Sequence, residues 1–176
     1  MQDEPQQPVE AVYGGEPLAP PHDPQLSALL AEQVAGRLTR YWAAIPRGLV
    51  RPFSAAYDPS RSPTWAPVYR HLLGQMHVGA YPNLTTYQQG AEFITSDDYL
   101  AYRAYEEVQA AWVPCYVLGE SASDALRGLR LAPEEAARRD VQERGRDFQQ
   151  SLLLFEYLQR ADIREWNGHP PEPPRD

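Results

Sequence analysis

Apolar side chains recur every three or four residues in several stretches of this chain, which is the spacing of one face of an α-helix. The clearest stretch begins at Asp23, a good N-cap, followed by Pro24, a good first helical residue. Its apolar positions extend from Leu26 to Ile45. The pattern predicts a helix over residues 24–44.

The same spacing predicts shorter helices farther along the chain. Proline bounds them, because it is tolerated in the first turn of a helix but not in the interior. We expect these helices over residues 65–77, 97–113 and 124–130.

The segments between these helices contain prolines, glycines or short apolar runs. Residues 46–66 hold four prolines and are predicted to form a loop. Residues 78–95 are predicted to be irregular, with a short strand at 92–95. The apolar run at 115–118 is predicted to be a buried connector.

The longest predicted helix covers residues 133–166, because Pro133 opens it and no further proline interrupts it. At about 1.5 Å per residue it would extend for roughly 50 Å. Val141, Phe148 and Phe155 are spaced by seven, as in the seam of a helical bundle or coiled coil.

Together these elements predict an all-α fold, a small helical bundle of three main helices and two short ones. The helical domain is expected over residues 24–168. The ends differ in composition, since six of the 18 prolines lie in residues 1–24 and four in the last seven. We therefore expect an acidic, proline-rich arm over 1–23 and a proline-rich tail over 169–176.

Charge is unevenly distributed along the 176 residues, whose net charge is −8. Residues 1–32 hold six acidic residues and no arginine, whereas residues 33–91 hold six arginines and one aspartate. Residues 92–176 are acidic again, and all 16 basic residues of the chain are arginine. The overall negative charge disfavours nucleic acid as the partner, because nucleic-acid-binding domains are usually basic.

The sequence contains no linear enzyme motif. It lacks the phosphate loop, the dinucleotide fingerprint, the zinc-protease motif and the serine nucleophile elbow. Cys115 lies among apolar neighbours that favour an inert thiol, and the four histidines are scattered. We therefore predict no metal or cofactor and no catalysis; the enzyme alternative needs a cleft that assembles residues distant in sequence.

Arginine and aromatic side chains are interleaved over residues 37–70, and three tyrosines follow within the predicted 97–113 helix. Such side chains suit a protein interface or single-stranded nucleic acid, although the aromatic ones also suit a core. The residues predicted to bind a partner are Arg37, Arg40, Trp42, Arg47, Arg51, Phe53, Tyr57, Trp65, Tyr99, Tyr102 and Tyr105.

The sequence therefore predicts a non-catalytic structural or adaptor protein that assembles through its arms and helical faces into a homo-oligomer or a larger complex. A virion or phage connector component is an example of this class. The first alternative is a small acidic regulator that binds and inhibits a host enzyme or mimics nucleic acid. The second is nucleic-acid binding through residues 37–70.

The expected location is the cytoplasm or a virion, without secretion. No stretch approaches the roughly 18 consecutive apolar residues of a membrane span. The first residues, from Met1, lack the basic and apolar regions of a signal peptide.

Overall fold

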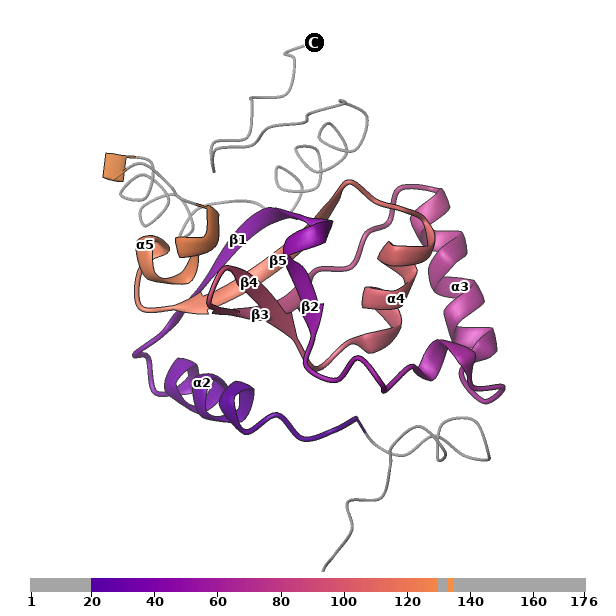
Figure 1. Ribbon diagram of the computed structural model, residues 1–176, viewed down its shortest axis with the longest axis horizontal. Helices are drawn as coiled ribbons and strands as arrows, with labels where there is room; N and C mark the ends of the chain where they lie inside the picture. The colour runs from indigo at the N-terminus through magenta and orange to yellow at the C-terminus, as the bar shows by residue number, and fades with distance from the viewer. Residues whose placement is uncertain (1–19, 130–132, 135–176) are drawn as a thin grey trace, which may run out of the picture.

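Five strands form one mixed sheet in the part of the chain that the computed structural model describes, residues 20–129 and 133–134 (Figure 1). The protein is therefore α/β, and the prediction of an all-α helical bundle is wrong. In chain order the helices and strands are α2 (Pro24–Val34), β1 (Thr39–Pro46), β2 (Val50–Pro52), α3 (Ala66–His77), β3 (Leu84–Gln89), β4 (Glu92–Thr95), α4 (Tyr99–Glu107), β5 (Trp112–Gly119) and α5 (Ala122–Ala125).

The helix predicted over residues 24–44 is only half present, because α2 ends at Val34 and β1 begins at Thr39. Gly36 has a φ of +80°, a left-handed conformation that commonly ends helices. The side chains of residues 41–45 in β1 are all buried. A continuous apolar run of this kind does not distinguish a buried strand from a buried helix, which is why the prediction failed here.

The sequence pattern also missed β2, in the predicted loop over 46–66, β3, in the segment predicted to be irregular over 78–95, and β5. The helix predicted over 97–113 ends at Glu107 in α4, and the predicted connector at 115–118 is the middle of β5. β5 lies between two neighbours and has most of its side chains buried. Strands covered on both faces lack the alternation of apolar and polar residues that identifies a half-exposed strand.

The strand order in the sheet is β1-β5-β3-β4-β2. β1 pairs with β5, and β3 with β4, in antiparallel fashion, whereas β3 with β5 and β2 with β4 are parallel. Gly90, with a φ of +63°, forms the tight turn between β3 and β4. The sheet therefore brings the start and the end of the described chain together, because β1 and β5 are neighbours.

One face of the sheet packs against α2. Leu26 of this helix contacts Tyr87, Ile94 and Leu118, which come from three different strands. Asp23 is buried at the N-terminus of α2, where its carboxylate accepts hydrogen bonds from backbone N–H groups of the first turn. The same carboxylate accepts a hydrogen bond of 2.7 Å from the Tyr87 hydroxyl. Asp23 thus both caps α2 and attaches it to the sheet.

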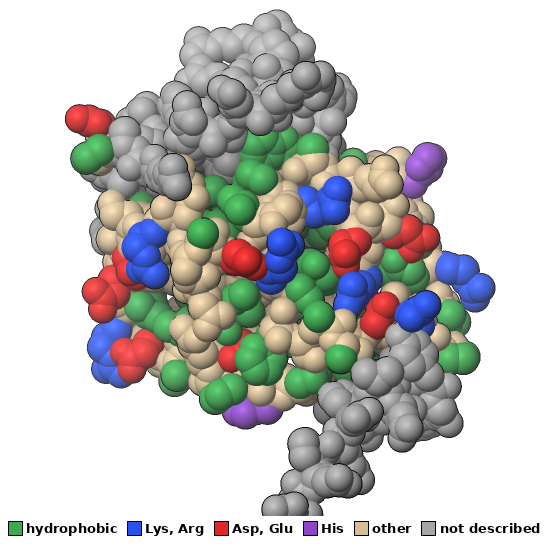
Figure 2. Space-filling view, in the orientation of Figure 1, with side chains coloured by type: hydrophobic (Ala, Val, Ile, Leu, Met, Phe, Trp, Pro, Cys, Tyr) green, Lys and Arg blue, Asp and Glu red, His purple; other side chains and the backbone are tan. Residues whose placement is uncertain are grey.

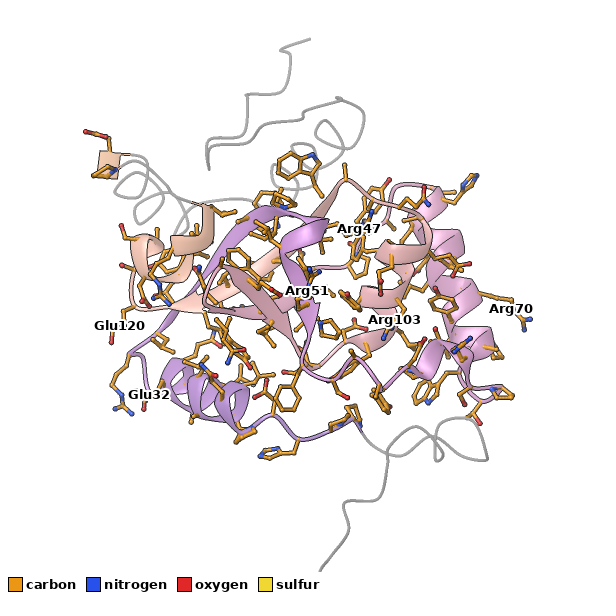
Figure 3. All side chains as sticks on the ribbon, in the orientation of Figure 1. Glu32, Arg47, Arg51, Arg70, Arg103 and Glu120 are labelled. Atoms are coloured by element: carbon orange, nitrogen blue, oxygen red, sulfur yellow. The ribbon has the colours of Figure 1, made fainter. Side chains whose placement is uncertain are left out.

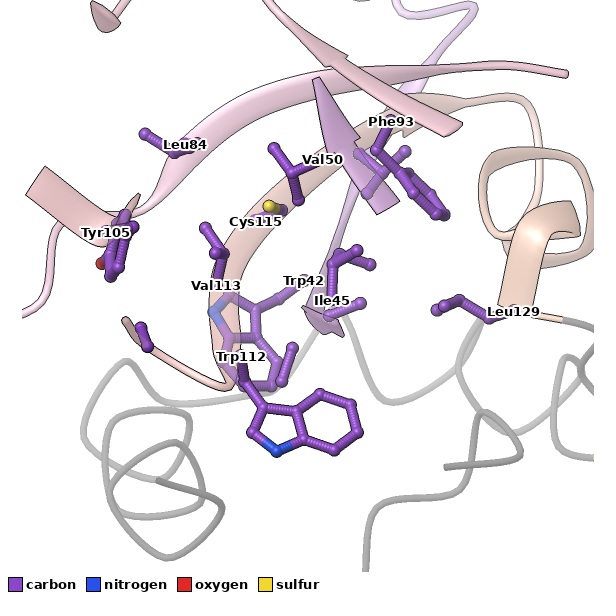
Figure 4. Packing of buried hydrophobic residues seen from close by; sticks show 14 of the residues in the cluster. Trp42, Ile45, Val50, Leu84, Phe93, Tyr105, Trp112, Val113, Cys115 and Leu129 are labelled. Carbon is purple, nitrogen blue, oxygen red and sulfur yellow. The ribbon is translucent and has the colours of Figure 1, made fainter. Parts of the chain in front are cut away.

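The larger apolar cluster includes sheet residues and Tyr105 of α4 (Figure 4), together with a side chain of α3. Leu84, Phe93 and Cys115 come from the sheet, Met76 from α3 and Tyr105 from α4. α3 and α4 contact each other and lie side by side at one end of the molecule (Figure 1). Their C-terminal ends are neighbours, because His77 of α3 and Glu107 of α4 line the same groove.

Several shorter predictions are confirmed. The helix predicted over 65–77 is α3, and the strand predicted at 92–95 is β4. The helix predicted over 124–130 is divided between α5 and a 3-10 turn at Arg127–Leu129. The arm before residue 20, the helix predicted over 133–166 beyond its first two residues, and the tail over 169–176 lie outside the described residues.

Candidate functional site

Five of the aromatic residues predicted to bind a partner lie in the interior. The Tyr57 and Tyr99 rings meet edge to face with their centroids 4.9 Å apart, and the Tyr105 hydroxyl donates to the Pro82 carbonyl oxygen at 2.6 Å. These contacts assign the side chains to the core of the monomer. The buried set is Trp42, Tyr57, Tyr99, Tyr102 and Tyr105.

Two of the predicted arginines form ion pairs with acidic residues of the same chain. Arg37 pairs with Glu32, and the Nε atom of Arg51 lies 3.0 Å from Oε2 of Glu92. Figure 2 shows basic and acidic side chains alternating across this face, on which Figure 3 labels Arg51 and Arg103. Because the charges alternate, the arginines do not form a continuous basic stripe on this face.

The other two predicted arginines contact a carbonyl group and an aromatic ring. Arg47 donates its Nε–H to the carbonyl oxygen of Ala110 at 2.8 Å. The Arg40 guanidinium carbon lies 4.9 Å from the centroid of the Tyr116 ring, within cation–π distance. Both arginines therefore have a role within the fold.

Phe53 and Trp65 remain exposed among the predicted partner-binding residues. Phe53 follows β2, whereas Trp65 is the N-cap residue of α3. A partner-binding role for this pair stays a prediction. The structure does not gather the whole predicted set on one surface.

A groove of about 630 Å³ lies where α3 and α4 end. Its apolar part includes Val108, which is 44% exposed. The volume falls in the range of sites for drug-sized ligands, about 300–1,000 Å³. The residues that line the groove are Leu73, Met76, His77, Tyr81, Glu107, Val108, Gln109, Ala110 and Ala111.

The charge at the edge of this groove is negative. α3 ends at His77 and α4 at Glu107, so the partially negative ends of both helix dipoles lie there. The Tyr69 hydroxyl of α3 donates a hydrogen bond to the Glu107 carboxylate of α4. Burial and then this hydrogen bond raise the pKa of Tyr69, so the phenol stays protonated and keeps donating.

The solvent-facing side of α3 forms a second exposed surface, called here the outer face of α3. Val78, at the C-terminal end, is 80% exposed. Gly74 lies inside the helix, and a Cβ added there would meet no atom within 4 Å. The outer face consists of Pro67, Val68, Arg70, His71, Gly74 and Val78.

The N-terminus of α4 differs from an anion site because it already holds two carboxylates. Asp98 caps the helix by accepting a hydrogen bond of 3.0 Å from the Ala101 N–H. Partial burial and then repulsion from Asp98 raise the pKa of Asp97. An anionic ligand, which a helix N-terminus otherwise favours, would meet both acids here.

The histidine, cysteine and acidic side chains of the described residues do not gather into a metal site. No group of three or more His, Cys, Asp or Glu side chains within residues 20–129 and 133–134 is arranged to hold a metal ion. Cys115 is fully buried, and burial raises the pKa of its thiol.

The groove does not follow from the sequence pattern, because the helix predicted over residues 97–113 is longer than α4. The helix predicted over residues 97–113 has residues 107–111 in its C-terminal part, where they would not form a rim. Gln109 adopts a φ of +53° just after α4, a position that usually carries glycine or asparagine. Because Gln109 is neither glycine nor asparagine, no residue in the sequence signals the turn that forms one wall of the groove.

Comparisons with known proteins do not extend this picture. No family model matches the chain, and neither a curated protein nor a solved structure does. Among the described residues, none of the helices has the length and apolar character needed to cross a membrane. Function is therefore argued from the surfaces of this molecule.

Proposed function

We propose that the chain is a non-catalytic assembly protein whose copies bind one another. In this proposal the acidic N-terminal segment of one copy lies on the outer face of α3 of another copy. The supporting observation is that this helix face combines exposed apolar side chains with positive charge. Exposed apolar side chains beside a positive charge suit a partner segment that is itself partly apolar and acidic.

Charge complementarity selects the N-terminal segment as the occupant. Residues 59–91, which include all of α3, contain no aspartate or glutamate. Within the described residues, Arg70 makes no ion pair or hydrogen bond, and Figure 3 shows it directed away from the sheet. Residues 1–19 contain four acidic residues and no basic one. Opposite charges of this kind orient two partners and speed their encounter.

The test measures the mass of the full-length chain in solution by sedimentation equilibrium over a range of concentrations. We expect the unmodified chain to form a defined oligomer. Neutralising the segment by Asp3→Asn, Glu4→Gln, Glu10→Gln and Glu16→Gln should shift the mass toward the monomer. Raised salt should act in the same direction, since exposed charges are screened.

Reversing one charge on each of two surfaces distinguishes a specific role of the outer face of α3 from a general effect of net charge on association. Arg70→Glu should dissociate the oligomer, as neutralising the four acidic residues of the N-terminal segment should. Arg127→Glu is the matched control, because Arg127 is also exposed but pairs with Asp124 of α5, away from α3. A monomeric unmodified chain, or equal effects of the two reversals, would contradict the proposal.

A further inference from the structure

We infer that the groove at the ends of α3 and α4 binds an arginine side chain presented by an extended, partly apolar segment of a partner protein. The groove is a different surface from the outer face of α3. Its rim is acidic and favours a cation, whereas the outer face of α3 is proposed to bind an acidic segment. The inference therefore does not depend on the assembly proposed above.

The first argument is electrostatic. Two helix C-termini meet at the groove, and cations are favoured at such ends. Glu107 adds a full negative charge, and within the described chain no basic side chain pairs with it. Its neighbour Glu106 differs, because Oε1 of Glu106 lies 2.9 Å from Nη1 of Arg103. Of the two adjacent carboxylates, Glu107 is the one available to an incoming cation.

The second argument concerns how the Glu107 carboxylate is held. The Tyr69 hydroxyl donates to its Oε2 atom, which leaves Oε1 free of a partner within the described chain. A carboxylate fixed by one neutral donor loses less conformational freedom when it binds a guanidinium group. Charge-assisted hydrogen bonds between arginine and carboxylate are stronger than neutral ones.

The third argument is the apolar lining, which distinguishes an arginine side chain from a small inorganic cation. Leu73, Met76 and Val108 provide aliphatic contact, and Met76 can adapt its shape to a ligand. An arginine side chain buries its methylene stem on such surface while the guanidinium stays near water. Tyr81 also lines the groove and offers an aromatic ring to a guanidinium.

The remaining lining residues fit the same ligand. Gln109 is exposed, and its side-chain amide oxygen can accept a hydrogen bond from a guanidinium N–H. Arg47 does not compete for the site, because its Nε–H is bonded to the Ala110 carbonyl oxygen and Arg47 does not line the groove. His77 lies at the rim as the last residue of α3.

The test titrates the full-length chain with three acetylated and amidated pentapeptides, Ala-Leu-Arg-Leu-Ala and its counterparts with glutamine or glutamate at the centre. Binding is followed by NMR of isotope-labelled side-chain methyl groups. We expect the arginine peptide alone to bind with a Kd below about 1 mM. The methyl signals of Leu73, Met76 and Val108 should shift, whereas those of Leu26 in α2, away from the groove, should not.

Two variants with the same change in charge locate the site. Glu107→Gln should weaken the arginine peptide about fivefold, the upper range for a partly exposed ion pair. Glu106→Gln, one residue earlier on α4, should leave the affinity within about twofold. Both glutamates are at the surface, so the fold should persist, and circular dichroism of each variant checks that it does.

Three outcomes would overturn the inference. One is the absence of saturable binding by the arginine peptide, and another is equal binding by the glutamine peptide. The third is equal weakening by the two glutamate variants. None of these outcomes bears on the solution mass of the chain, so the assembly proposal can fail while this inference stands, or the reverse.

Discussion

Gly74 and Gly36 show how backbone conformation decides the effect of a single methyl group. A Cβ added at either position would meet no atom within 4 Å. Gly74 lies inside α3, where glycine loses more conformational freedom on folding than alanine does. Gly36 has a φ of +80°, which places a Cβ in a strained left-handed conformation. The same substitution should therefore have opposite effects at the two sites.

We expect Gly74→Ala to raise the free energy of unfolding by about 1 kcal/mol, the difference between the two residues in a helix interior. Gly36→Ala should lower it by about 1 kcal/mol. Urea denaturation followed by circular dichroism measures both. Changes of the same sign would contradict the backbone argument, since neither methyl group has a packing partner.

At the scale of one element, the attachment of α2 depends on a single buried carboxylate. Asp23 accepts hydrogen bonds from the N–H groups of Gln25 and Leu26 and from the Tyr87 hydroxyl. Tyr87 is itself buried, so removing Asp23 takes away the acceptor that the structure gives to its hydroxyl. An unpaired buried hydroxyl costs about 1–3 kcal/mol, beyond the loss of the helix cap.

Asp23→Ala should therefore destabilise the protein by about 2–4 kcal/mol, combining the lost cap with the unpaired hydroxyl. Adding Tyr87→Phe to this variant should recover part of the loss, because it removes the unpaired group. A double-mutant cycle by urea denaturation measures the coupling. Additive losses would show that the Asp23–Tyr87 hydrogen bond does not hold α2 in place.

The elements that the sequence predicted well have signals at their ends. Asp23 and Pro24 mark the start of α2. The apolar residues of α3 recur at helical spacing, with prolines at the start of the helix and a glycine after its end. β1 and β5 gave no such signal, because their side chains are buried on both faces and form continuous runs. Whether such a run becomes strand or helix depends on partners distant in the chain, which the local pattern does not contain.

The candidate groove was less predictable than the fold. It needs α3 and α4 side by side, and it needs α4 to end at Glu107 rather than continue to residue 113. Both conditions depend on packing against the sheet. The arginines and aromatic residues singled out by composition mostly bind or pack within their own chain, because a core and its ion pairs use the same residue types as an interface.

At the scale of the whole molecule, the thiol of Cys115 reports on the integrity of the sheet. It lies on β5 with no exposed surface, between two neighbouring strands. Reaction needs both access and a thiolate, and burial raises the pKa of the thiol. A thiol reagent should therefore reach this sulfur only when β5 separates from its neighbouring strands.

We expect labelling of Cys115 by a thiol reagent to be slow in buffer and fast in concentrated urea. At subdenaturing urea the rate should increase in proportion to the population of the unfolded state, as it does for groups exposed only by global opening. The measurement is the absorbance change on reaction with a disulfide reagent. Fast labelling under native conditions would show that β5 opens locally.

The position of β5 also determines when the protein can fold during its synthesis. β1 is completed at Pro46, yet within the described sheet its only neighbour is β5, which begins at Trp112. A nascent chain that has not yet released β5 from the ribosome has no partner strand for the buried side of β1. Pairings between segments so distant in sequence form slowly, because a long loop must close first. A growing chain would therefore carry the apolar residues of β1 without their partner strand until translation is well past residue 119.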